Sequence, residues 1–174
     1  MSKAFTKEDD AGDALVPRLV SPLPPGARNY LTRAGAARLR AELERLAGEE
    51  RPALLAVAGE AGMRGAEAQE RLQHVDQRIA YLNESLRTAE VAPAPPPPHD
   101  TVRFGATVAV RDGRGQAATY RIVGVDEADH SRDEVSWLSP IARALLNARL
   151  GQRVPFHFPA GKTELEITGI RYEE

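Results

Sequence analysis

One stretch of the sequence carries apolar residues at alternating intervals of three and four positions, and this spacing restricts the fold more than any other feature. The residues in the series are Leu72, Val75, Ile79, Leu82 and Leu86, and Ala89 continues it. Such a repeat places every member on one side of an α-helix and is typical of the seam of a coiled coil. A helix with one apolar side needs a partner, so we expect a second helix to lie against it.

The partner is predicted to be the helix that precedes this one in the chain. Thr32 fits the N-cap position, because its hydroxyl can accept a hydrogen bond from an otherwise unpaired backbone N–H. The leucines that mark the apolar face are Leu39, Leu43 and Leu46. Pro52 interrupts the pattern and either kinks this helix or starts a new one. The two helices form an antiparallel hairpin over residues 31–92, about 35 Å long. Two helices bury little, so the base of the hairpin should dock on another domain.

The turn of the predicted hairpin falls in the stretch "GEAGMRGAEAQE", residues 59–70. Its glycines are Gly59, Gly62 and Gly65, and its charged residues are Glu60, Arg64, Glu67 and Glu70. Acidic side chains are favourable near the N-terminus of the second helix, so these residues can be ordinary solvated helix-end residues. The glycines favour a blunt and flexible turn.

The chain changes character after a proline-rich spacer at residues 93–100. Residues 101–174 are predicted to contain three strands, a helix and two further strands, in that order, which makes a compact α+β domain. The helix is expected to start at Ser139, which can cap it, and to end at Gly151. Residues 1–30 are predicted to be an extended or disordered tail.

Composition argues against several functional classes. The formal net charge is −2, unlike that of domains that bind nucleic acid through a basic face. The chain has no cysteine, which excludes disulfides, thiol catalysis and thiolate zinc sites. No apolar run approaches the length of a membrane span, and the first residues lack a signal-peptide core, so we expect a cytoplasmic protein. Common catalytic and nucleotide-binding motifs are missing, so an autonomous enzyme is not expected.

Two further segments have a composition that could serve binding. The acidic stretch "DEADHSRDE", residues 126–134, could hold a cation, but its irregular spacing favours a solvated loop. The proline run could be read by a partner that recognises polyproline II helices, although a spacer between domains is the simpler interpretation.

Six segments, taken together, are similar to one protein family. They are "NYLTRAGAARLRAELERLAGEERP", "RLQHVDQRIAYLNESL", "FGATVAV", "YRIVGVDEAD", "SPIARALLNARLGQRV" and "PAGKTELEITGIRYE". In order and spacing they resemble the bacterial transcript-cleavage factors GreA and GreB, and GreB more closely. The first two resemble the arms of the family's coiled coil, and the other four resemble its C-terminal domain. The resemblance covers the chain from about Asn29 to Tyr172.

The resemblance implies a fold, a partner and a way of acting. The fold would be an α-helical coiled-coil hairpin joined to an FKBP-like α+β domain. The partner would be bacterial RNA polymerase, with the hairpin entering its secondary channel, and nascent RNA or DNA would be met only within the transcription complex. Family members have no cofactor of their own, but acidic residues at their tip help to hold a second Mg²⁺ in the polymerase active site, where it activates water. We expect a monomer that binds no membrane.

The resemblance also carries over to particular residues. Ser139, Pro140 and Arg143, in "SPIAR", match the polymerase-docking segment of the family, although Leu138 stands where relatives carry Asp or Asn. The same residues could simply start and pack a helix. The family's acidic tip motif, of the type Asp-x-x-Ser-Glu-Asn, has no clean counterpart here. Each arm is also shorter by about one turn, or ~5 Å.

Four hypotheses remain open from the sequence. The chain could be a polymerase-binding factor with weak or no stimulation of cleavage, or a true cleavage factor that shares Mg²⁺ through Glu60 and Glu67. It could instead be a peptide-binding or prolyl-isomerase module, for which Trp137, Phe156 and Phe158 are the aromatic candidates. The heptad could finally serve dimerisation.

Overall fold

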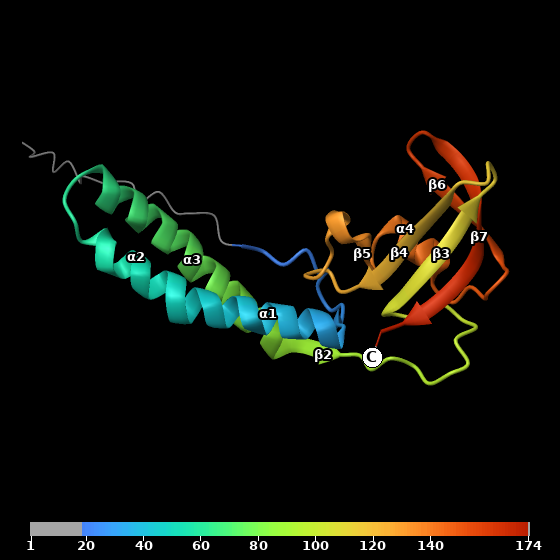
Figure 1. The fold of residues 1–174 in the computed structure, drawn as a ribbon, viewed down its shortest axis with the longest axis horizontal. Coiled ribbons are helices and arrows are strands. Elements are labelled where there is room, and N and C mark those ends of the chain that lie inside the picture. Colours follow the sequence, from blue (N-terminus) through green and yellow to red (C-terminus); the bar gives the residue numbers. More distant parts are fainter. Residues whose placement is uncertain (1–18, 174) are drawn as a thin grey trace, which may run out of the picture.

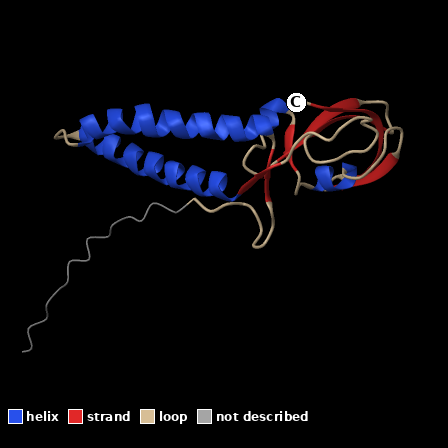
Figure 2. Cartoon of the chain, turned by 90° about the horizontal axis from the view of Figure 1, so that it is seen from below, coloured by secondary structure: helices blue, strands red, loops and turns tan. Residues whose placement is uncertain are grey.

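The computed structural model describes residues 19–173 and shows an elongated molecule, with a helical hairpin at one end and a sheet domain at the other (Figure 1). The two arms of the hairpin run side by side in two perpendicular views, and the sheet lies beyond their base (Figure 2). The predicted α+β class, with an N-terminal hairpin and a C-terminal mixed domain, is confirmed. Most of the tail predicted for residues 1–30 lies outside the described residues. Within residues 19–173, none of the helices combines the length and the apolar character that a membrane span requires.

The outgoing arm of the hairpin is a continuous helical path made of three segments. They are α1 (Arg33–Arg45), the π-helical turn η1 (Leu46–Glu50) and α2 (Arg51–Ala58). Thr32 caps α1 as predicted, accepting a hydrogen bond from the Gly35 N–H at 3.0 Å. The Arg51 N–H bonds to the Leu46 carbonyl, five residues back, so the path widens just before Pro52. Pro52 then lies in the first turn of α2, a position that proline tolerates. The proline starts a new segment without ending the arm.

The returning arm is α3 (Met63–Thr88), and the predicted seam packs it against the outgoing arm. The buried members of the shared core are Leu31, Ala36, Leu39, Leu46, Val75 and Leu82, and the partly buried members are Leu43, Leu54, Ile79, Leu86 and Ala89. This core is densest at the base, because α2 contains no buried residue. The tip of the hairpin therefore depends on the base for its stability.

Ion pairs across the arms border the apolar seam. The Arg78 guanidinium donates two hydrogen bonds to Glu42, at 2.7 and 2.9 Å, and these bonds lower the pKa of Glu42. The Arg51 Nε donates to Asp76 at 2.6 Å. Both pairs join α1 or α2 to α3, so they favour this register of the two arms, although each is partly exposed and contributes about 1 kcal/mol or less.

The C-terminal domain is built on one curled sheet with the strand order β5-β4-β3-β7-β6. The strands are β3 (Ala106–Asp112), β4 (Ala117–Val123), β5 (Glu134–Ser136), β6 (Arg153–Phe158) and β7 (Gly161–Tyr172). Strands β4 and β5 pair in parallel, and the other pairs are antiparallel. The predicted order of three strands, one helix and two strands is confirmed.

The helix of this domain, α4 (Pro140–Leu145), is shorter than predicted. The prediction that it extends to Gly151 is wrong, because Leu146 already leaves the helical conformation with ψ 136°. Asn147 then adopts a positive φ of 66°, and its N–H bonds to the Val102 carbonyl at 2.8 Å. The chain thus exchanges helical hydrogen bonds for bonds to the start of the domain. Ala142 and Leu145 bury the inner side of α4 in the domain core.

A small parallel sheet closes the base of the hairpin. It pairs β1 (Asn29–Leu31) with β2 (Ala89–Val91). Asn29 and Tyr30, predicted as the end of the tail, therefore belong to the folded part. The Asn29 side-chain amide donates to the Ser85 carbonyl at 2.9 Å, which ties β1 to the end of α3.

Candidate functional site

The tip of the hairpin is a tight turn at residues 59–62 whose geometry requires glycine. Gly62 has φ +93°, a conformation that side chains rarely allow. A Cβ atom on Gly65 would lie 1.9 Å from the Glu60 carbonyl oxygen, so α3 can begin this close to the turn only because Gly65 has no side chain. These glycines fit a defined turn, which differs from the loose end expected from glycine content alone.

The charged residues predicted for the tip do not form a preformed metal site. The Glu60 carboxylate lies 3.7 Å from the guanidinium of Arg64, and both side chains are exposed. Glu67 and Glu70 are exposed on α3. Within residues 19–173, no three acidic or histidine side chains come together as metal ligands would. A metal site needs carboxylates held in position, and here a cation already neighbours one of the two candidates.

Replacing Gly65 with alanine is expected to lower the free energy of unfolding by about 1–3 kcal/mol, because the new methyl group would collide with the backbone of the turn. The matched control is Gly48→Ala in η1, where a Cβ atom meets nothing within 4 Å. Alanine favours helices over glycine by about 1 kcal/mol, so the control should be neutral or stabilising. Urea unfolding followed by circular dichroism measures both. If Gly65→Ala stabilised the protein as much as the control, the described turn would be wrong.

The predicted docking segment, residues 138–143, combines both interpretations given to it. The Ser139 hydroxyl accepts a hydrogen bond from the Ala142 N–H at 3.2 Å and so caps α4, with Pro140 in the first turn. Ala142 is fully buried, whereas Pro140 and Arg143 are exposed. Leu138 is partly buried, and its N–H donates to the hydroxyl of a nearby serine. The buried side of the helix start therefore packs in the domain core, while its exposed side, with Pro140 and Arg143, is accessible to a partner.

The docking segment lies beside the base of the hairpin. Strands β4 and β5 run in parallel, with Val123 opposite Ser136, so the segments that follow them leave the same edge of the sheet. After β5 comes Trp137 and the docking segment; after β4 comes a loop at residues 124–133, the junction loop. The Trp137 ring packs edge-on against Tyr30 of β1, with 5.7 Å between ring centroids. The hairpin thus contacts Trp137, which directly precedes the docking segment in the chain.

Two consecutive acidic residues of the junction loop hold the two arms of the hairpin. Glu127 accepts hydrogen bonds from the Thr32 N–H at 2.9 Å and from the Thr32 hydroxyl, at the start of α1. Asp126 accepts hydrogen bonds from the hydroxyls of Tyr81 and Ser85, on α3. We call this pair of carboxylates the junction clamp. The prediction that the acidic stretch is a solvated loop is wrong for these residues, since Glu127 is only 5% exposed.

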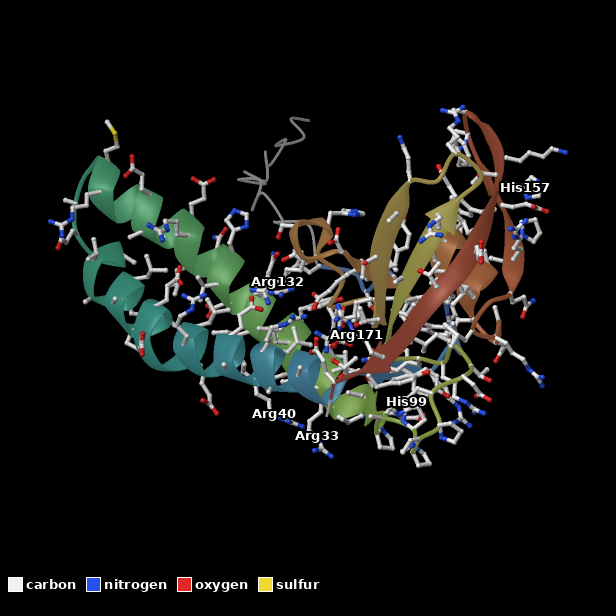
Figure 3. The ribbon with its side chains drawn as sticks, turned by 45° about the vertical axis from the view of Figure 1, so that its right-hand side comes forward. Arg33, Arg40, His99, Arg132, His157 and Arg171 are labelled. Carbon is white, nitrogen blue, oxygen red and sulfur yellow. The ribbon has the colours of Figure 1, made fainter. Side chains whose placement is uncertain are left out.

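Arginines of both modules add to the junction. Arg38 of α1 donates to both oxygens of the buried Glu134 carboxylate at 2.9 Å, and Arg121 lies 3.6 Å from the same group. Figure 3 places Arg132 and Arg171 in the angle between the hairpin and the sheet. All four arginines line a cavity of about 300 Å³ there. Sequence patterns could not find this network, because its partners lie far apart in the chain.

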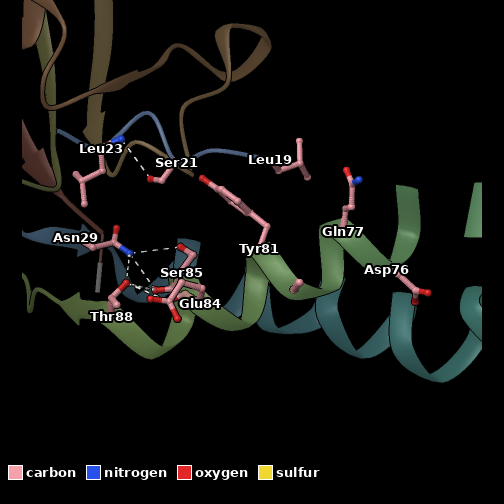
Figure 4. A pocket seen from close by; sticks show the side chains of 11 residues that line it. Leu19, Ser21, Leu23, Asn29, Asp76, Gln77, Tyr81, Glu84, Ser85 and Thr88 are labelled. Atoms are coloured by element: carbon pink, nitrogen blue, oxygen red, sulfur yellow. Dashed lines mark hydrogen bonds between the residues drawn. The ribbon is translucent and has the colours of Figure 1, made fainter. Parts of the chain in front are cut away.

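A groove of about 530 Å³ follows α3 beneath the described start of the chain (Figure 4). Its apolar lining includes Leu19, Leu23 and Ala80, together with Tyr81. Burial and the hydrogen bond to Asp126 raise the pKa of Tyr81 to about 12. The residues of α3 that line the groove, such as Ala80 and Tyr81, are not heptad positions, so the heptad spacing did not indicate the groove.

Two of the three aromatic residues considered for a peptide-binding site, Trp137 and Phe156, pack against the domain core, whereas Phe158 is 40% exposed. Phe156 and Phe158 stack on each other on β6, with centroids 6.0 Å apart. Trp137 is engaged with Tyr30, and Trp137 and Phe156 both pack against the domain core. For Trp137 and Phe156 these contacts favour core packing over a pocket for proline peptides.

Family models match both modules of the chain. The model described as "Transcription elongation factor, N-terminal" matches residues 29–91, and the model described as "Transcription elongation factor, GreA/GreB, C-term" matches residues 97–172. The two matches together cover the hairpin and the sheet domain.

Curated relatives carry the names of both branches. Transcription elongation factor GreB of Neisseria meningitidis serogroup A is 36% identical over 154 residues, which covers 83% of this chain and 94% of the relative. Transcription elongation factor GreA of Alkalilimnicola ehrlichii is 41% identical over 152 residues, covering 82% and 96%. Among solved structures, GreA factor homolog 1 of Thermus thermophilus matches with a TM-score of 0.39 and 24% identity over 83% of this chain and 99% of that one. The two family-model matches and the curated relatives show that the chain belongs to the GreA/GreB family of transcription elongation factors.

Proposed function

We propose that this chain binds bacterial RNA polymerase and modulates transcription elongation, with weak or no stimulation of transcript cleavage. The sheet domain would dock on the polymerase through the segment at residues 138–143, and the hairpin would enter the secondary channel. The protein acts in the cytoplasm as a monomer, meeting RNA and DNA only inside the transcription complex. Any chemistry belongs to the polymerase, so the chain is not itself an enzyme.

The observation that carries the proposal is the tip. Members of the family that promote cleavage share a Mg²⁺ ion with the polymerase through acidic tip residues. Here Glu60 lies next to Arg64, at 3.7 Å, and Glu67 stands exposed on α3 without a third ligand nearby in the described chain. An exposed carboxylate beside an exposed arginine is not held in position by its surroundings, as a metal ligand needs to be. The residues present therefore fit a shared Mg²⁺ site poorly.

The exposed surface at the tip supports a role other than metal delivery. Helix α2 has the sequence RPALLAVA, carries no acidic residue and has no fully buried residue. Leu55 on α2 is 48% exposed and Met63 at the start of α3 is 78% exposed. An end of this kind is suited to apolar contact inside a channel. By occupying the channel it would affect pausing or exclude other factors.

Charge reversal at Arg143 tests the proposed docking. Arg143 and Arg149 are both exposed, and neither forms an ion pair within the described residues, so Arg143→Glu and Arg149→Glu change the net charge equally. Arg143→Glu is expected to weaken binding to core RNA polymerase at least tenfold, which corresponds to about 1.4 kcal/mol, and Arg149→Glu to change it less than threefold. Fluorescence anisotropy with labelled protein measures the affinities. Equal affinities for the two variants would place docking elsewhere, and no binding by the parent would refute the proposal.

A further inference from the structure

The hairpin and the sheet domain are joined covalently by a single segment, residues 92–105, which contains neither helix nor a named strand. The direction of the hairpin relative to the domain therefore depends on non-covalent contacts at the junction. Those contacts are concentrated on the junction loop, where Asp126 and Glu127 each hold a different arm.

Glu127 connects the two modules through backbone groups. Its Oε2 accepts the Thr32 N–H of the hairpin at 2.9 Å and the Gly124 N–H of its own domain at 2.8 Å. Its Oε1 accepts the hydroxyl proton of Thr32, whose oxygen in turn caps α1 by accepting the Gly35 N–H. One buried carboxylate thus satisfies donors on both sides, and buried donors left without a partner are strongly unfavourable.

The Glu127 side chain is tightly enclosed by backbone of both modules. A Cβ atom on Gly35 would lie 1.7 Å from the Glu127 Oε1, and one on Gly124 would lie 2.2 Å from the Tyr30 carbonyl oxygen and 2.7 Å from the Glu127 Oε2. Two glycines, one on each module, therefore let the hairpin and the domain approach through this carboxylate. Such a fit restricts the angle between the modules and not only their contact.

We infer that the junction clamp is a positioning device, in which Glu127 and Asp126 together, each holding a different arm, set the direction of the hairpin relative to the docking segment. The two features are close, because the junction loop and the docking segment leave the same edge of the sheet and Trp137 packs on Tyr30. When the clamp is broken, the protein keeps its docking surface, but its tip no longer points in one direction. The inference rests on the proposed function only for this consequence.

Distance measurement tests the clamp without any polymerase. The chain has no cysteine, so spin labels can be placed on introduced cysteines at Gln69 of α3 and Ala118 of β4, both exposed. Double electron–electron resonance should show one narrow distance distribution for the labelled parent. Glu127→Ala should broaden it at least twofold. Glu127→Gln should keep it narrow, because an amide oxygen can still accept both backbone N–H groups. The control Glu164→Ala removes an exposed carboxylate of β7 and should leave the width unchanged.

A second variant covers the case in which Glu127→Ala fails to fold. Tyr81→Phe with Ser85→Ala removes the two hydroxyls that donate to Asp126, while the Asn29 amide keeps its bond to the Ser85 carbonyl, and circular dichroism would verify the helix content. This double variant should also broaden the distribution. If neither variant broadens the distribution beyond the Glu164→Ala control, the inference is overturned.

A polymerase experiment then separates the clamp from the proposed function. The clamp variants should bind core RNA polymerase within threefold of the parent, while crosslinking from a photoreactive residue at Met63 falls at least fivefold. Unchanged crosslinking with a broadened distribution would overturn the positioning role. If the parent itself does not bind, the proposed function fails, while the distance result still decides whether the clamp sets the angle.

Discussion

Replacing Leu82 with alanine is expected to lower the free energy of unfolding by about 2–5 kcal/mol. Leu82 is 0% exposed and lies in the core at the base of the hairpin, where both arms and β1 meet. Its truncation removes buried methyl groups and leaves a cavity, which the packed side chains of α1 and β1 cannot move to fill. Urea unfolding gives the change in the free energy of unfolding, with the helix signal of circular dichroism as the readout.

The matched control for this prediction is Leu55→Ala on α2. Leu55 is the same residue type in the same hairpin, but it is 48% exposed. We expect its truncation to change the free energy of unfolding by less than about 1 kcal/mol. Hydrogen exchange should also show that Leu82→Ala loosens α1 and α3 more than the strands, because the hairpin and the domain have separate cores. Equal effects of the two substitutions would contradict the described packing.

Leu145→Ala is expected to have a comparable effect on the other module, again about 2–5 kcal/mol. Leu145 is 0% exposed and anchors α4 in the domain core. A helix of only six residues cannot be stable alone, so α4 depends on this anchor. The substitution should therefore loosen the docking segment as well as destabilise the domain.

The readout for Leu145→Ala is binding to core RNA polymerase together with urea unfolding. In buffer without urea, where the variant is still folded, its affinity for core RNA polymerase should fall at least fivefold. Leu150→Ala is the control, since Leu150 is 52% exposed and follows α4 in the chain. If Leu145→Ala lost stability but kept full affinity, the segment at residues 138–143 would not be the docking surface.

Periodic features of the sequence predicted the fold well. The heptad from Leu72 to Leu86 identified α3 and its partner, because the seam is written at a fixed spacing within one helix. Thr32 and Ser139 were recognisable as N-caps, because a cap depends on residues three positions apart. Local chemistry of this kind is visible without any knowledge of the tertiary structure.

Features that depend on distant partners were missed. Glu127 contacts Thr32, which lies 95 positions away, and nothing in the irregular acidic stretch distinguishes a buried acceptor from a solvated one. Gly35 lies inside the predicted first helix, and nothing in the sequence shows that the approach of Glu127 requires a glycine there. The end of α4 was placed too late, because Asn147 bonds to Val102 in an earlier part of the chain.

Transcript cleavage in a backtracked RNA polymerase complex tests the central claim most directly. The complex is incubated with saturating protein and Mg²⁺, RNA length is followed over time, and bound protein is measured in the same sample. The account predicts that the protein binds and that the RNA shortens no faster than without it. Rapid shortening that is lost in Glu60→Ala or Glu67→Ala would contradict the account, because it would show that the tip delivers a metal ion after all.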